Sequence, residues 1–348
     1  MMNHKERFLA TIANAPVDRP ASWIGLPDPA AIPGLIRHLG LNTMEEVKIL
    51  LDDDIYPIEV PYYSSHSNHI AGAFDFAKRD QLKLPGERTL TTPGFFEVYD
   101  DPADVSKFNW PDPAKYLDGE EIHRRVNAAG SDYARMGILW SSHFHDSCSA
   151  FGMETALTTM LTNHEMYRAV LTKITNFYLK ANEIFYEATK GKLDAVLLGD
   201  DFGSQTGLML DPELIRQYIF PGTKLLIDQA KSYGLKVMYH SCGSIFPLIE
   251  DIFRLGADII HPLQARATDM SVENIHKHFS GKGAFCGGID AQYLMVEGSP
   301  EDVKKRVHEV IDLFPTGLIV SPSYEAFLPD IPPENIEALF KTVANRKL

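Results

Sequence analysis

The chain of 348 residues has little cysteine and no long apolar run. Its three cysteines, Cys148, Cys242 and Cys286, are too few and too scattered for a disulfide framework. No run reaches the roughly 18 apolar residues that span a bilayer, and the N-terminal MMNHKERFLATIANA lacks the apolar core of a signal peptide. We therefore expect a cytoplasmic protein with no membrane segment, in which a functional cysteine binds metal or acts in catalysis.

Positive charge is also scarce. The chain has 33 Lys and Arg against 47 Asp and Glu, a formal net charge of −14. A nucleic-acid partner requires a clustered basic face, and an anionic membrane surface requires basic residues as well. The charge balance argues against both partners and selects no other.

No linker or low-complexity stretch divides the chain, so we expect a single domain over residues 1–348. Short apolar runs alternate with helix-like segments, as in parallel sheets buried on both faces. We count eight candidate strands, which predict an α/β fold of the (β/α)8 TIM-barrel type. They are 20–26, 54–60, 137–144, 195–201, 236–243, 257–264, 283–290 and 317–323. The interval 61–118 breaks the pattern, and its β-like pieces predict an inserted hairpin or flap near the barrel mouth.

The sharpest local signal is YHSCG at 239–243. In a strand, His240 and Cys242 project from the same face, and an imidazole beside a thiolate is half of a zinc site. Gly243 would allow the chain to turn sharply behind them. Cys286 is our third candidate ligand, with Glu325 and His261 as competitors. The alternative is a buried histidine beside a buried cysteine, without metal.

In a TIM barrel the active site lies at the carboxyl ends of the strands. We take Asp200 and Asp201, in LLGDDFG, as acid/base candidates, because one of two adjacent strand-end residues must face inward. Capping of the following loop is the alternative for this pair. Asp54 is a further catalytic candidate, at what we take to be the end of an early strand.

The same reasoning supplies candidates for substrate binding. His143 and His145, in HFHDSC, are expected to share a strand face and to bind substrate or support the site, with a purely structural use as the alternative. The other candidates lie at or after the later strand ends; they are Gln205, His261, Gln264, Asp290 and Glu325.

Several segments together resemble the uroporphyrinogen decarboxylase superfamily. They are the opening MNHKERFLATIANAPVDRPASW, the run from GDDFGSQTGLML to ADIIHPLQ, and the later FCGGIDAQYLMVEGSPEDV and DIPPENIEALF. Within the superfamily the chain is more similar to the cobalamin-dependent methyltransferase branch. The resemblance covers most of the chain from about residue 135. It implies one (β/α)8 barrel with its pocket at the carboxyl ends of the strands.

The two branches differ in their charged residues. Porphyrinogen decarboxylases carry an Arg-rich N-terminal motif for substrate carboxylates, whereas this chain has no Arg between Arg19 and Arg37. Asp54 still matches the catalytic Asp of that branch. The methyltransferase branch binds zinc through His-x-Cys and a distant Cys. His240 and Cys242 match the pair, but SPSYEAFLPDIPPEN has no Cys at the distant place, which leaves Cys286, Glu325 or no zinc at all.

The resemblance implies a zinc-dependent methyltransferase, in which zinc activates a thiol or similar small-molecule acceptor. The methyl group would move between that acceptor and methyl-cobalamin on a separate corrinoid protein. The alternative is a metal-free decarboxylase acting on a less anionic substrate through Asp54 or Asp200. A non-catalytic carrier of corrinoid or metal is the third hypothesis.

Overall fold

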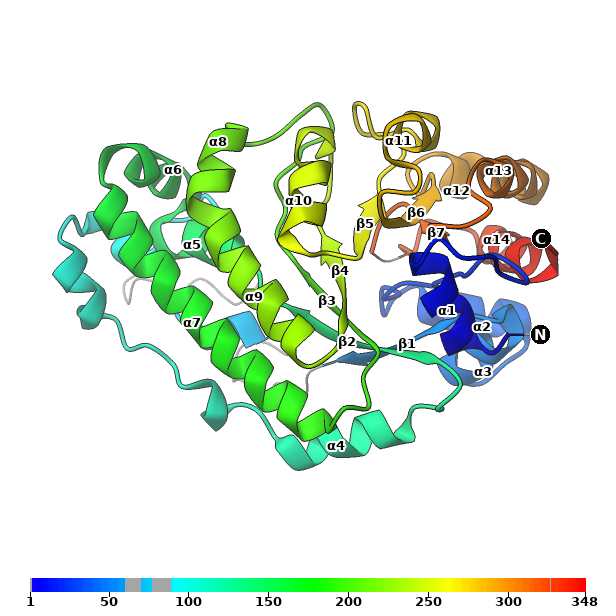
Figure 1. Ribbon diagram of the computed structural model, residues 1–348, viewed down its shortest axis with the longest axis horizontal. Coiled ribbons are helices and arrows are strands. Elements are labelled where there is room, and N and C mark those ends of the chain that lie inside the picture. Colours follow the sequence, from blue (N-terminus) through cyan, green and yellow to red (C-terminus); the bar gives the residue numbers. More distant parts are fainter. Residues whose placement is uncertain (1, 60–69, 77–88, 326) are drawn as a thin grey trace.

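A computed structural model describes residues 2–59, 70–76, 89–325 and 327–348. Its centre is one parallel sheet of seven strands in the order β1 to β7, curled as in a TIM barrel (Figure 1). The strands are β1 (Ile55–Glu59), β2 (Ala134–Trp140), β3 (Ala195–Gly199), β4 (Lys236–His240), β5 (Ile259–Leu263), β6 (Ala284–Ile289) and β7 (Leu318–Pro322). β3, β5, β6 and β7 are buried along their whole length, as their apolar runs predict.

The first of the eight predicted strands, 20–26, is not a strand in the structure. Only Ser22 forms a parallel bridge, to Val320 of β7. The backbone amides of Ser22 and Ile24 donate instead to the Asp54 and Asp53 carboxylates, at 2.8 and 3.1 Å. The segment still links the two edges of the sheet. Val320 donates to the Ala21 carbonyl at 2.8 Å, and Asp54, just before β1, donates to the Ser22 carbonyl at 3.1 Å.

Helices surround the curled sheet, with α7 and α9 forming its long cover beside β2 and β3 (Figure 1). Both termini lie on the side of α1 and α14. The helices are α1 (His4–Ile12), α2 (Ile32–Leu39), α3 (Met44–Leu51), α4 (Gly119–Ala128), α5 (His143–Phe151), α6 (Met153–Thr162), α7 (His164–Thr189), α8 (Pro212–Leu214), α9 (Phe220–Ser232), α10 (Ile249–Leu255), α11 (Val272–Phe279), α12 (Leu294–Glu297), α13 (Pro300–Leu313) and α14 (Pro333–Asn345). None of the described helices is long and apolar enough to span a membrane.

Alternation along the strands divides the core into two layers. Ala195 and Leu197 of β3 point to the inner layer, whereas Val196 and Leu198 point to the helices. The amino end of the sheet is covered by α1, whose Phe8 and Ile12 belong to the inner layer. The carboxyl end therefore remains as the place for a site.

The described part of 61–118 contains no strand, so the predicted hairpin is wrong there. It consists of short 3-10 helices, η1 (Ile70–Ala73), η2 (Phe95–Val98), η3 (Pro102–Lys107) and η4 (Pro113–Lys115). An aromatic cluster buries this segment against α7; the ring centroids of Phe74 and Phe177 are 4.5 Å apart, and those of Phe76 and Phe108 are 4.9 Å apart. Residues 61–69 and 77–88 of the expected flap lie outside the described residues.

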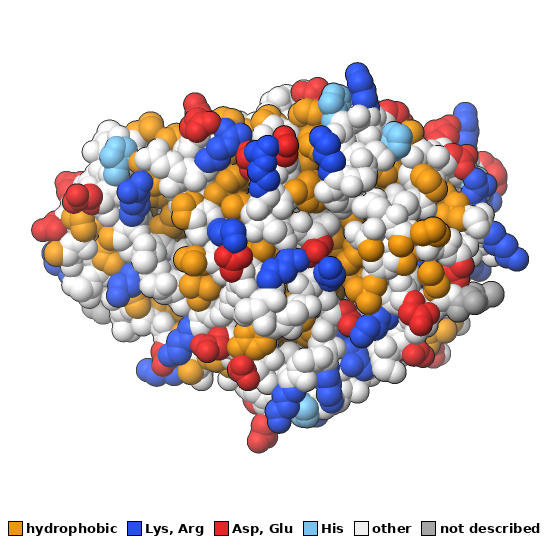
Figure 2. All heavy atoms as spheres, viewed as in Figure 1, with side chains coloured by type: hydrophobic (Ala, Val, Ile, Leu, Met, Phe, Trp, Pro, Cys, Tyr) orange, Lys and Arg blue, Asp and Glu red, His pale blue; other side chains and the backbone are white. Residues whose placement is uncertain are grey.

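Charge is mixed over the face shown in Figure 2. Basic and acidic side chains alternate across it, with apolar side chains between them. This face therefore carries no extended patch of one sign.

Candidate metal centre

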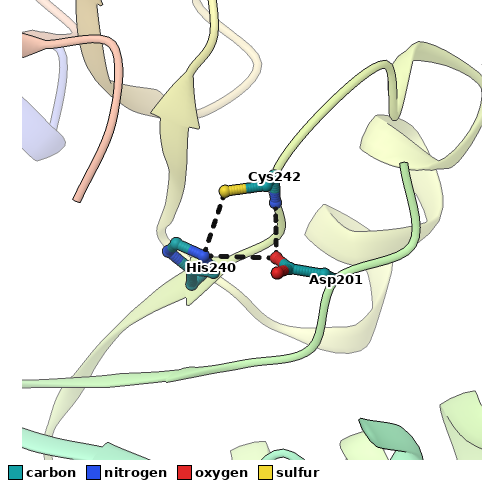
Figure 3. Close-up of side chains that lie close together, drawn as sticks. All are labelled: Asp201, His240 and Cys242. Carbon is teal, nitrogen blue, oxygen red and sulfur yellow. Dashed lines mark hydrogen bonds and ion pairs between the residues drawn. The ribbon is translucent and has the colours of Figure 1, made fainter. Parts of the chain in front are cut away.

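Three potential ligands meet at the carboxyl ends of β3 and β4. Asp201 follows β3, His240 is the last residue of β4, and Cys242 comes two residues later. One ligand atom from each lies within 4.8 Å of the others. His240 Nε2 is 3.3 Å from Asp201 Oδ1 and 3.5 Å from Cys242 Sγ, and all three side chains point toward one another (Figure 3). The structure thus brings the predicted His-x-Cys pair together and adds a carboxylate.

The turn behind this cluster depends on Gly243. Its φ of +82° lies in the left-handed region, which favours glycine. A Cβ at this position would lie 2.4 Å from the backbone of Gly203. Gln264 holds the turn, since its Oε1 accepts a hydrogen bond of 2.6 Å from the Gly243 amide. Gln264 therefore supports the ligand loop from the end of β5.

The electrostatics of the cluster suit a cation. Burial opposes ionisation of Asp201, but the hydrogen bond and charge of His240 and the amide of Cys242 outweigh it and lower the pKa to about 2. Burial, then the negative charges of Asp201 and Glu325, raise the pKa of the Cys242 thiol well above its ordinary value. A divalent ion would replace the thiol proton of Cys242. Its positive charge would offset both the cost of burying the thiolate and the repulsion from the neighbouring carboxylates. One imidazole, one sulfur and one carboxylate oxygen are all zinc ligands, so the residues present fit zinc.

Glu325 lies beside the cluster without belonging to it. Its Oε2 is 3.8 Å from Cys242 Sγ. The backbone is fixed there, since the Leu26 amide donates to the Glu325 carbonyl at 2.8 Å. Burial, then the charge of Glu325, raises the pKa of the neighbouring Tyr324 to about 12. Besides Asp201, Glu325 is the described residue whose carboxylate is seen to contact the Cys242 sulfur.

The structure does not bring Cys286 to the cluster. Its side chain is fully buried in the inner apolar layer with Ile259 and Ile319. Burial raises the pKa of this thiol, as expected for a packed cysteine. Among the described residues, Asp201 takes the place that sequence analysis assigns to Cys286.

His261 stands behind His240 rather than beside the sulfur. The Nδ1 atoms of the two rings are 3.0 Å apart, and His261 is fully buried. Trp140 covers another side of His240, with ring centroids 5.0 Å apart. Trp140 and Ser141 have φ of +54° and +58° after an irregularity in the pairing of β2. Such strain in consecutive non-glycine residues is typical of functional sites, and nothing in the sequence reveals it.

Asp200 faces away from the cluster. Its carboxylate oxygens accept hydrogen bonds from the amides of Phe144 and His145, at 3.2 and 3.0 Å, and so cap the start of α5. Its Oδ2 is also 3.1 Å from His143 Nδ1. Burial raises the pKa of Asp200 and lowers that of His143, so it weakens the charge on both members of this contact. Asp200 therefore caps a helix rather than the loop that follows it, and Asp201 is the inward member of the pair.

The expectation that His143 and His145 share a face is wrong. It assumes a strand through residue 144, but α5 begins at His143. Residues two apart on a helix point in different directions. His143 is buried, and its Nε2 is 3.1 Å from the Ile219 carbonyl, whereas His145 is exposed.

Two other candidates bind no neighbour in the cluster. Gln205 is exposed in the loop after β3. Asp290 caps the turn before α12, accepting from the amides of Gln292 and Tyr293 at 2.9 and 3.3 Å. A substrate contact for either residue stays a prediction.

Asp54 lies at the opposite end of the sheet. The predicted strand 54–60 begins there rather than ends, because β1 starts at Ile55. The fully buried carboxylate accepts from Arg7 Nη1 at 2.7 Å and from Arg19 Nη1 at 2.9 Å. A five-residue strand is about 15 Å long, so Asp54 cannot touch a ligand at the cluster.

Asp146 in α5 predicts an unusual dependence of stability on pH. Burial raises the pKa of its carboxyl to about 8, although Tyr178 hydrogen-bonds to it. Between about pH 4 and pH 8 the folded chain keeps a proton that the unfolded chain releases, so this group's contribution to stability falls as pH rises. Asp146→Asn removes that loss. We expect the variant to gain about 1.4 kcal/mol per pH unit over the native chain in that interval, measured by urea unfolding.

The two proteins should be equally stable near pH 4, where both side chains are neutral. Parallel stability curves for the two proteins across the pH range would contradict the assignment.

Comparison with known proteins places the chain in a family. No curated protein matches it. Among solved structures, a methyltransferase from Methanosarcina mazei superposes with a TM-score of 0.68, at 15% sequence identity and over 99% of both chains. That similarity shows the fold. The family model for uroporphyrinogen decarboxylase (URO-D) matches residues 96–346, so the chain belongs to the uroporphyrinogen decarboxylase family.

Proposed function

We propose that this protein is a zinc-dependent methyltransferase that works with a corrinoid protein. The observation that carries the proposal is the meeting of Asp201, His240 and Cys242 at the carboxyl ends of β3 and β4. The family match and the fold shared with a methyltransferase support it. A soft sulfur and an imidazole suit zinc and a sulfur substrate better than a purely carboxylate site would.

Each residue has a defined task in this proposal. Asp201, His240 and Cys242 would hold the ion, and Asp201 also fixes the Cys242 backbone, whose amide donates to Oδ1 at 2.8 Å. Zinc, when bound, lowers the pKa of a thiol acceptor so that the nucleophilic thiolate persists at neutral pH. Trp140 and Gly243 restrict where His240 and Cys242 can move. The methyl group would come from methyl-cobalamin on the partner protein.

Metal removal tests this function. We expect the purified protein to contain about one zinc per chain and to transfer methyl groups from methyl-cobalamin to a small thiol. A chelator should abolish the transfer, and added zinc should restore it, whereas added magnesium should not. Transfer that persists at full rate in demonstrably zinc-free protein would refute the proposal.

A further inference from the structure

His240 and His261 form a pair at the inner face of the sheet. They are cross-strand neighbours in the register of β4 and β5. Their Nδ1 atoms are 3.0 Å apart, which is a hydrogen-bond distance. His240 is 4% exposed and His261 is fully buried, so water does not compete for this contact. The pair therefore acts as one unit behind the metal cluster.

The contact restricts where protons can be. Two ring nitrogens at this distance share one proton, because two N–H groups would repel and two lone pairs would not bind. If His240 Nδ1 donates, its Nε2 presents a lone pair toward Cys242 and Asp201. If His261 Nδ1 donates, His240 Nε2 carries the proton and donates to Asp201 Oδ1, 3.3 Å away. Only the first arrangement permits His240 to bind a metal.

Packing holds the His261 ring in place beside His240. Its ring lies 5.2 Å from that of the fully buried Trp23, centroid to centroid. Among the described residues, its Nε2 has no hydrogen-bond partner. The Nδ1 contact with His240 is thus the hydrogen bond that the ring makes within the described structure. A buried imidazole with this single partner is arranged to orient that partner.

Resting on the function proposed above, we propose that His261 is a positioning residue that directs His240 Nε2 toward the metal. It accepts the His240 Nδ1–H and thereby keeps the ligating nitrogen unprotonated. Histidine ligands in metal sites almost always donate their second ring N–H to an acceptor, commonly a carboxylate, a backbone carbonyl or water. From the sequence alone we expect His261 to contact substrate or to compete as a ligand, and this positioning role differs from both.

Zinc affinity and ring protonation test the role without relying on activity. His261→Phe keeps a buried ring and removes the acceptor, so we expect zinc affinity to fall about 10- to 100-fold. His261→Asn restores an acceptor near the Nδ1 position and should recover most of that loss. Affinity is measured by competition with a chromophoric chelator. His276→Phe is the matched control. It replaces a half-buried histidine of α11 whose ring packs against Phe314, and it should leave zinc affinity unchanged.

Nitrogen-15 spectra of the zinc-loaded native chain give an independent readout if His261→Phe does not fold. We expect protons on His240 Nδ1 and His261 Nε2. A proton on His240 Nε2 in the loaded protein, or unchanged zinc affinity in folded His261→Phe, overturns the inference. Absence of methyl transfer with normal zinc binding would refute the proposed function and leave the role of His261 standing.

Discussion

Replacing Cys242 with alanine should lower zinc affinity by about 100-fold or more. If a binding free energy of about 12 kcal/mol is shared among the three protein ligands, the loss of one costs about 4 kcal/mol. Methyl transfer should fall with zinc occupancy. Competition with a chromophoric chelator measures the affinity, and metal analysis of the purified variant measures the occupancy.

Cys286→Ala is the matched control. Cys286 is buried in the inner apolar layer, away from the cluster, so its loss should leave zinc affinity unchanged, while Asp201→Asn should weaken it. Because the Cys242 thiol is protonated in the absence of metal, native affinity should also rise about tenfold per pH unit near neutrality. A larger loss in Cys286→Ala than in Asp201→Asn would show that the cluster is not the metal site.

Asp54→Asn should destabilise the protein by about 3 kcal/mol without entering the chemistry. The change leaves the buried guanidinium groups of Arg7 and Arg19 without their shared carboxylate, and breaking a buried ion pair costs roughly 3–5 kcal/mol. We take the lower end, because Asp18 and Asp52 remain as partners. Guanidinium chloride unfolding measures the loss of stability. At low temperature, where the variant is still folded, its zinc affinity should equal that of the native chain.

Asp228→Asn serves as the surface comparison. Asp228 pairs with Lys224 across one turn of α9, with both side chains exposed to solvent, and its loss should cost less than about 0.5 kcal/mol. The decarboxylase hypothesis makes the opposite prediction for Asp54→Asn, namely lost turnover at unchanged stability. That result would also overturn our placement of Asp54 away from the site.

The strands were predictable from sequence where apolar runs are buried on both faces, as in β3 to β7. Segment 20–26 misled us because its amides bind the side chains of Asp53 and Asp54, which no apolar pattern reveals. The hairpin expected in 61–118 failed in the described part because aromatic residues there pack as a cluster against α7. A segment with alternating aromatic residues resembles a strand in sequence, even where its backbone pairs with no neighbouring strand.

The site was predictable to the extent that it is local. His240 and Cys242 follow one strand, so their spacing sufficed. The third member comes from a different strand, and choosing Asp201 over Cys286 requires knowing the depth of each in the barrel. Asp54 was misplaced for a different reason: it is the first residue of the predicted strand 54–60 and precedes β1, so chain direction alone places it at the amino end of that strand.

The bridge between Ser22 and Val320 joins the first part of the chain to the last. During synthesis at about 5–20 residues per second, β7 follows Ser22 by roughly 15–60 s. The cluster of Arg7, Arg19 and Asp54 can assemble in that interval, because all its members are translated early. The seam at Val320 cannot close until the final strand has left the ribosome. Any sheet that β1 to β6 form before that point is therefore an open crescent, in which the free edges of β1 and β6 have no partner strand.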